Sequence, residues 1–161
     1  MIKIDQNLVI SCNKKAESSV RKRTNHNFHE VNEDLIQRLI NAVEPYSYIQ
    51  PHKHENPDKR EVFTILSGSV LVVEFDNSGK ITDSIVLNFQ NGNFGCEIKA
   101  KTWHTIIALE PGSALFEVKD GPYNPNEDKI FAPWAPKEGD PDTNSYIDRI
   151  LRKLELKVSG R

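Results

Sequence analysis

The chain has 161 residues, with 21 basic and 23 acidic side chains and a formal net charge of −2 at neutral pH. This length predicts one domain, spanning residues 1–161, and the balanced charge gives no electrostatic reason to expect a nucleic acid as partner. Polar residues interrupt the apolar start at Asp5, Gln6 and Asn7, which argues against a signal peptide, and no apolar run is long enough for a transmembrane helix. We therefore expect a cytoplasmic protein without a membrane partner.

The region before residue 46 is predicted to contain one weak strand and one helix. The strand covers Asn7–Ser11, and polar residues follow it. The helix covers residues 33–43, because Asn32 is a good N-cap and Pro45 blocks continuation. Apolar side chains at helical spacing form one stripe on it, which we expect to pack on the outside of a sheet. These side chains are Leu35, Ile36, Leu39, Ile40 and Val43.

A series of short strands is predicted from residue 46 to residue 119, which we take as the core of a barrel. The candidates are Tyr46–His54, Glu61–Leu66, Ser69–Phe75, Ile81–Phe89, Cys96–Lys99, Thr105–Leu109 and Ala114–Lys119. Turn-forming segments rich in Asn, Gly and Pro separate several of them. Short strands at close spacing are typical of an all-β sandwich or barrel. We choose a double-sheet jelly roll, because it can bring ligands from different strands to one mouth.

Two segments follow the strands. Residues 120–142 are rich in Pro, Gly and charged residues, and this segment is too long for a simple turn. It is expected to pack along the barrel wall or to form a lid over an opening. Residues 143–156 are predicted to form an amphipathic helix that either covers the core or contacts another protomer. The apolar surface of this helix contributes to the expectation of a homodimer.

A candidate metal site comes from three histidines and a glutamate. His52 and His54 lie two residues apart, so on a strand they point to the same face. Glu61 opens the next strand, where a hairpin can bring it opposite the histidines, and His104 lies on a later strand. This ligand set suits one divalent metal ion such as Fe, Mn, Ni, Zn or Cu, with open positions left for water or substrate. The alternative is a solvated polar loop, and the joint spacing favours the metal site.

The spacing resembles the two motifs of the cupin superfamily. His52, His54, Glu61 and Gly68 match the first motif, and the run from Gly92 to His104 matches the second. The second motif departs from the common form, because Lys101-Thr102 stands where Pro-x-Gly is usual and no Asn follows His104.

More narrowly, the chain resembles the WbuC family of cupin-fold metalloproteins. The matching segments are Gln37-Arg38-Leu39, Pro51-His52-Lys53-His54, Lys59-x-Glu61-x-Phe63, Trp103-His104-Thr105, Glu117-Val118-Lys119, Gly121-Pro122-Tyr123 and Trp134-Ala135-Pro136. The resemblance implies a mainly β fold, the cupin-type double-stranded β-helix, and we expect an N-terminal-side helix and a C-terminal helix beside it. It also implies a context of surface polysaccharide synthesis.

Alternation of side chains along the strands predicts which further residues line a pocket beside the metal site. If the histidines point inward, Tyr48 and Gln50 do so too, and Lys59 and Phe63 share the face of Glu61. Polar groups among apolar walls are the usual composition of a small-molecule site. The resemblance also places His29 near this pocket.

Three residues are candidates for catalytic roles. Tyr48 is expected either to act as an acid or base or to bond a backbone carbonyl. Lys59 either holds a substrate phosphate or carboxylate or is a surface lysine. Glu117 lies on a central strand, where a charged group needs a partner if it faces the interior. Glu117 and Tyr48 are the candidates for the base.

Three classes of function remain open. A metal-dependent isomerase, epimerase or lyase would use the ion as a Lewis acid, and the resemblance favours a sugar or sugar derivative as the substrate. An iron-dependent oxygenase would place O₂ and substrate on the open positions of the ion. A binding protein would hold a small molecule without chemistry. The first class is the preferred hypothesis.

Overall fold

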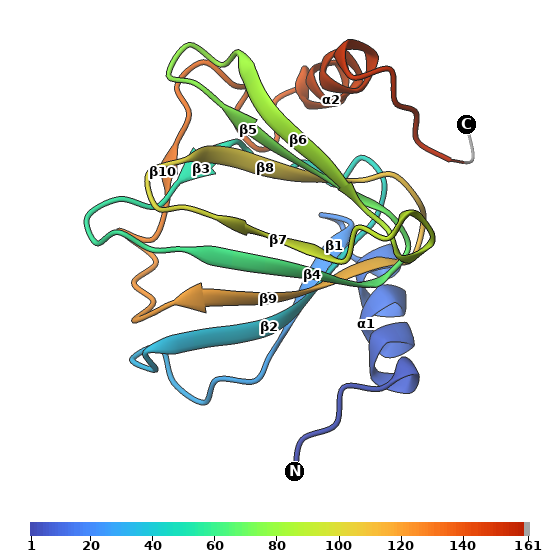
Figure 1. Cartoon of the computed structure of the whole chain (residues 1–161), viewed down its shortest axis with the longest axis vertical. Coiled ribbons are helices and arrows are strands. Elements are labelled where there is room, and N and C mark those ends of the chain that lie inside the picture. The colour runs from blue at the N-terminus through green and yellow to red at the C-terminus, as the bar shows by residue number, and fades with distance from the viewer. Residues whose placement is uncertain (160–161) are drawn as a thin grey trace.

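The structure, a computed structural model, describes residues 1–159 and consists mainly of two antiparallel five-stranded sheets that face each other (Figure 1). The first sheet has the strand order β1 (Arg23–Asn27), β2 (Ile36–Val43), β9 (Ser113–Asp120), β4 (Glu61–Ser67) and β7 (Gly95–Ile98). The second has the order β10 (Ile130–Phe131), β3 (His52–Lys53), β8 (Trp103–Ala108), β5 (Val70–Phe75) and β6 (Ile81–Leu87). The predicted mainly β jelly roll with two helices is confirmed. The organisation as one domain spanning residues 1–161 stays a prediction. Residues 160–161 of this range lie outside the described residues.

Alternation along the strands separates the core between the sheets from the outer faces. Val70 and Val72 of β5 lie in the cluster between the sheets, whereas Leu71, Val73 and Phe75 lie in a cluster on the outside of the second sheet. This is the two-sided pattern expected from the sequence, because successive side chains of a strand point to opposite faces.

The N-terminal helix α1 (Gln6–Ser18) replaces the predicted strand Asn7–Ser11, which was wrong. Asp5 caps the helix, since its side chain accepts a hydrogen bond of 3.0 Å from the backbone N–H of Leu8. The apolar residues Val9, Cys12 and Ala16 recur at helical spacing and pack on the outer face of the first sheet. The apolar run was too short to distinguish a strand from one turn of this helix.

The helix predicted over residues 33–43 was also wrong, because Ile36–Val43 forms strand β2. This strand is covered on both faces. Ile40 and Ala42 pack under α1, whereas Leu39 lines the interior cavity and Val43 lies in the core between the sheets. Burial on both faces removes the alternation that marks a half-buried strand, and the remaining apolar residues fall at helical spacing by coincidence.

The other predicted strands from Glu61 to Lys119 are confirmed, with small shifts at their ends. The exception is Tyr46–His54, in which only His52 and Lys53 are in a strand. The glycine of the first motif, Gly68, lies in the turn between β4 and β5 with φ of 70°. A β-carbon at this position would collide with the side chain of Ser113. Glycine is therefore required both by the backbone conformation and by the packing.

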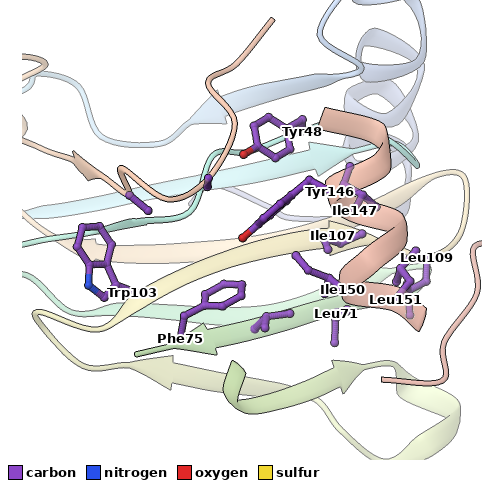
Figure 2. Packing of buried hydrophobic residues seen from close by; sticks show 13 residues of the cluster. Tyr48, Leu71, Phe75, Trp103, Ile107, Leu109, Tyr146, Ile147, Ile150 and Leu151 are labelled. Atoms are coloured by element: carbon purple, nitrogen blue, oxygen red, sulfur yellow. The ribbon is translucent and has the colours of Figure 1, made fainter. Parts of the chain in front are cut away.

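The C-terminal helix α2 (Thr143–Lys153) packs in cis on the outer face of the second sheet. Figure 2 shows Tyr146, Ile147 and Ile150 directed toward the sheet. Residues Leu71, Ile107 and Leu109 contribute the facing side chains. Of the two alternatives for this helix, it covers the core of its own chain. Among residues 1–159, neither helix is long and apolar enough to cross a membrane.

We predict that Ile150→Ala lowers the free energy of unfolding by about 2–5 kcal/mol, because it leaves a cavity in a packed cluster. Ile150 is 5% exposed. Chemical denaturation measures the effect, with Lys153→Ala on the exposed side of the same helix as control. The control is expected to change stability by less than about 0.5 kcal/mol. Equal effects of the two substitutions would contradict the packing of α2 on the sheet.

Candidate metal centre and adjoining cavity

The four predicted ligands converge between the two sheets at one end of the fold. His52 on β3 lies opposite His104 on β8 in the strand register, and His54 follows β3 directly. Glu61 is the first residue of β4, so it reaches the histidines from the facing sheet rather than through a hairpin with their strand. One potential ligand atom from each residue lies within 4.8 Å of the others, and no member is more than 4% exposed.

Backbone carbonyls fix the orientation of all three imidazole rings. The Nδ1 atoms of His52 and His104 lie 3.0 Å and 2.9 Å from the carbonyl oxygens of Gln50 and Thr102, and Nδ1 of His54 bonds to the carbonyl oxygen of Asp128. A carbonyl oxygen only accepts hydrogen bonds, so each Nδ1 atom carries the proton. In the neutral rings, the Nε2 atoms therefore present lone pairs, the form that binds a metal.

The geometry around Glu61 fits a cation better than a hydrogen-bonded network. Nε2 of His104 lies 2.8 Å from Oε2 of Glu61, and Nε2 of His54 lies 3.0 Å from Oε1. The buried Nε2 atom of His54 makes no aligned hydrogen bond. With Nδ1 protonated and the ring neutral, each of these Nε2 atoms directs a lone pair toward a carboxylate that also has only lone pairs. A divalent cation among them would remove this repulsion, so the residues present fit a metal ion.

The electrostatics of the cluster favour its ligand forms. Burial lowers the pKa of His52 well below its usual value, and the nearby charge of Lys129 acts in the same direction, so this ring is neutral at neutral pH. Burial alone would raise the pKa of Glu61, but its close contacts with the rings of His104 and His54 outweigh this effect and hold that pKa well below its usual value. Neutral imidazole and ionised carboxylate are the forms that bind metals.

A buried ion network supports the ligands from behind. Asp128 accepts hydrogen bonds from Nζ of Lys59 at 2.9 Å and from Nζ of Lys119 at 2.6 Å, and all three residues are buried. Nζ of Lys119 also lies 3.8 Å from Oε1 of Glu61. Burial opposes charge on Asp128, but attraction to Lys119 outweighs it and lowers the pKa of this carboxyl. Asp128 thus joins the network to His54 through its backbone and to Glu61 through Lys119.

A cavity of about 620 Å³ is lined by the neighbours Gln50, Lys119 and Asp128 of the cluster, whereas the four cluster residues themselves are not part of its lining. Its floor is the inner face of β1, β2 and β9, and its other walls include segments before β3 and around β10. Amide side chains are frequent in this lining, which is mainly polar. They are Asn25, Asn27, Asn32, Gln37, Asn41 and Gln50. Asn25 and Asn27 are exposed, so the cavity opens to solvent beside β1.

The structure brings three of the sequence-predicted pocket and catalytic residues to this cavity. Gln50 and Glu117 line it close to the cluster, and His29 lines it from the segment after β1. Glu117 is 8% exposed, and its Oε2 accepts a hydrogen bond of 3.0 Å from Asn41. Burial raises the pKa of Glu117, and the negative charge of Glu61 raises it further. Asn41 is the partner that a charged group in the interior requires.

The other three predicted residues lie away from the cavity. The hydroxyl of Tyr48 donates to the carbonyl of Pro136 at 2.6 Å, and the ring lies in the cluster under α2, so the alternative of a backbone contact applies. Lys59 is buried in its pair with Asp128 and is no surface lysine. Phe63 packs in the core between the sheets, with its ring centroid 6.5 Å from that of His104.

Sequence reasoning missed Asp128, Lys129 and the role of Lys119. Asp128 and Lys129 belong to the segment 120–142, which pairs with β3 through Ile130 and Phe131 and contributes residues to the lining of the cavity. The strand that follows them, β10, is only two residues long, so no alternation marked Asp128 or Lys129 as inward-facing. Lys119 lies two residues from Glu117 on the same strand face, and this parity was the available signal.

The turn before β8 contains a lysine in the left-handed conformation. Lys101 occupies it with φ of 67°, and its backbone N–H donates to the carbonyl of His54 at 2.9 Å. This hydrogen bond ties the second ligand segment to the first. Lys101 thus adopts the left-handed conformation in this turn although it is not a glycine.

Solved structures share this two-sheet fold. Protein SO0799 from Shewanella oneidensis has a TM-score of 0.55 at 10% identity, over 81% of this chain and 85% of that one. An uncharacterized conserved protein with a double-stranded beta-helix domain from Klebsiella pneumoniae has a TM-score of 0.53 at 17% identity, over 82% and 98%. At such identities the likeness concerns the fold alone. The fold is therefore the cupin-type double-stranded β-helix. It encloses a buried cluster of three His and one Glu.

The capsular polysaccharide assembling protein CapF from Staphylococcus aureus has the same fold over 68% of this chain, with a TM-score of 0.51 at 18% identity. The match spans only 31% of CapF, so it concerns a part of that protein. Comparison with curated protein sequences finds no match. The family model described as "Domain of unknown function (DUF6016)" matches residues 4–87, just over half of the chain. The chain belongs to this family.

We predict that Asp128→Asn lowers the free energy of unfolding by about 3–5 kcal/mol, because it removes the ion-pair partner of the buried Lys59 and the nearest counter-charge of the buried Lys119. Asp58→Asn is the matched control, since Asp58 pairs with Lys101 at the surface. The control is expected to cost less than about 1 kcal/mol. Denaturant titration of both variants decides the matter. A loss for Asp128→Asn as small as that of the control would contradict the support role of Asp128.

Proposed function

We propose that this protein is a metal-dependent enzyme of the isomerase, epimerase or lyase type that acts on a sugar or sugar derivative. The observation that carries the proposal is the set of inward-facing imidazole lone pairs around one buried carboxylate, beside a polar cavity. His52, His54, Glu61 and His104 would hold one divalent ion such as Fe, Mn, Ni or Zn. When bound, the ion supplies Lewis acidity toward substrate oxygens.

Glu117 is the candidate for the residue that moves the proton. It lies in the cavity wall close to the cluster, and Asn41 fixes one of its oxygens. The other oxygen, Oε1, has no hydrogen bond to any described residue and is free to accept a substrate proton. A carboxyl whose pKa is raised by burial is a suitable base near neutral pH, because it also releases the proton again. Tyr48 and Lys59 are not assigned this role, since their polar atoms have other partners.

The lining of the cavity supports a carbohydrate ligand. Amide side chains both donate and accept hydrogen bonds, so Asn41 and Gln50 can match hydroxyl groups on adjacent carbons. The resemblance to the WbuC family supports a role in surface polysaccharide metabolism. The name of the structural neighbour CapF, a capsular polysaccharide assembling protein, points in the same direction. A cytoplasmic location accords with this role, and the homodimer stays a prediction.

We predict that purified protein binds about one divalent ion per chain and that His52→Ala combined with His104→Ala abolishes this binding. Elemental analysis by mass spectrometry measures the stoichiometry, and the binding is lost because half of the ligand set is removed. His26→Ala is the control, because His26 packs edge-on against Phe28 outside the cluster. Unchanged metal content in the double variant would refute the metal centre.

We predict that metal-loaded protein incorporates deuterium from deuterated water into a sugar, a sugar acid or a nucleotide sugar. Glu117→Gln should retain the metal but slow exchange by about 10²–10⁴-fold, because it removes the proton acceptor. Glu97→Gln, an exposed residue on β7, is the control and should exchange normally. Mass spectrometry of the sugar measures incorporation.

Two outcomes would replace this proposal with another function. Oxygen uptake by iron-loaded protein with a substrate that shows no exchange would indicate the iron-dependent oxygenase. Binding of a sugar with neither exchange nor oxygen uptake would indicate a binding protein without catalysis.

A further inference from the structure

Lys129 is a cation at the cavity that forms no direct ion pair with any described residue. It directly precedes β10, and Phe131, two residues further, lines the same cavity and has its ring centroid 6.2 Å from that of His52. Alternation along an extended segment places Lys129 on the cavity side with Phe131. Within residues 1–159, its ammonium makes no hydrogen bond and no ion pair. A flexible charged side chain that ends in a binding cavity without a partner is available for a ligand.

The surroundings of Lys129 place its charge beside the metal cluster. Burial lowers the pKa of Lys129, and among charged groups the opposing attraction of Glu61 is the strongest. Lys129 is likewise the strongest charged influence on His52. Lys129 is exposed, and it lies in the wall of the cavity. A ligand in the cavity can therefore reach its ammonium.

The other cations of the cavity are already paired. Arg21 and Arg23 share the carboxylate of Glu138, each with a contact of 2.6 Å, and Lys119 is bound to Asp128. The cluster of His52, His54, Glu61 and His104 would add further positive charge once it holds a metal ion. Three neutral imidazoles and one carboxylate carry a single negative charge, so a divalent ion among them would leave one positive charge in excess. Glu61, Glu117 and Asp128 attract Lys129 without forming an ion pair with it. With a divalent ion bound, the inner end of the cavity would therefore carry an excess of positive charge.

We propose that Lys129 binds a carboxylate group of the substrate, and that the substrate is a sugar acid whose hydroxyl or carbonyl oxygens face the metal ligands. The inference rests on the proposed function and names its substrate class. A carboxylate fits better than a phosphate, because both helices lie on the outer faces of the sheets and no helix N-terminus is directed into the cavity. One ammonium suits a monoanion, whereas phosphate sites gather several donors.

Isothermal titration calorimetry of metal-loaded protein tests the inference with matched sets of ligands. Each set consists of a uronate, the corresponding neutral hexose and its 6-phosphate, in the gluco, galacto and manno series. We expect at least one uronate to bind ~10-fold or more tightly than its neutral partner. Lys129→Gln should remove this preference and weaken uronate binding by ~10- to 100-fold, because a charge-assisted hydrogen bond is lost. Lys129→Arg keeps the charge and should keep the preference.

Controls separate a binding effect from a change in the protein. Lys80→Gln removes an exposed lysine near the turn between β5 and β6 and should bind like the wild type. Metal content and thermal unfolding of Lys129→Gln should be unchanged, since the ammonium of Lys129 forms no hydrogen bond or ion pair with any described residue. Uronates that bind no better than neutral hexoses, or equally well to Lys129→Gln, would overturn the inference. Binding of the 6-phosphates alone would overturn the assignment of a carboxylate.

Failure of this inference and failure of the proposed function give different results. Lys129-dependent binding of a uronate without deuterium exchange would support the carboxylate site and refute the proton-transfer chemistry. Exchange into a neutral sugar that is unaffected by Lys129→Gln would support the chemistry and refute the carboxylate site.

Discussion

Three backbone carbonyls hold the imidazole rings of the cluster by their Nδ1 protons, and the rest of the site depends on this constraint. Once these protons are committed, the remaining nitrogens of His52, His54 and His104 can direct only lone pairs toward Glu61. The carbonyls come from three different places: two residues before His52, two residues before His104, and Asp128 in the segment 120–142. Closure of that segment over the barrel is therefore required for the third ring to be oriented.

The two sheets divide the interior into an apolar part and a polar part. Large aliphatic side chains fill the space between β4, β5 and β8, whereas the inner face of β1 and β2 carries amides and charges beside the cavity. Burying Lys59, Lys119 and Asp128 next to the ligands carries a desolvation cost that a purely structural core would avoid. The network offsets this cost through short charge-assisted hydrogen bonds, and Lys119 places its positive charge beside Glu61. Stability and site geometry are thus coupled through the same residues.

The segment 120–142 links the helix-covered exterior to the site. Ala132 and Ala135 pack in the outer cluster with α2, while Asp128 and Lys129 reach the ligands and the cavity. Anchoring by the outer cluster limits how far this segment can move away from the barrel mouth. Lys129, the proposed substrate contact, lies in the same segment that orients His54. A ligand at Lys129 would therefore contact a part of the cavity wall that the outer cluster already holds in place.

The sequence by itself determined the ligand set, most of the strands from Glu61 onward and the helix α2, because each of these depends on local spacing or alternation. It did not determine β2 or α1. Strand β2 is buried on both faces, so its sequence pattern lacks the alternation that identifies a strand. The apolar side of α1 consists of a few residues, and only their packing on the first sheet identifies them as one face of a helix. Tertiary structure alone decided that Tyr48 contacts Pro136 and that Lys129 faces the cavity. Those positions follow from how an irregular segment closes over the barrel, and long-range packing sets that closure rather than any local periodicity.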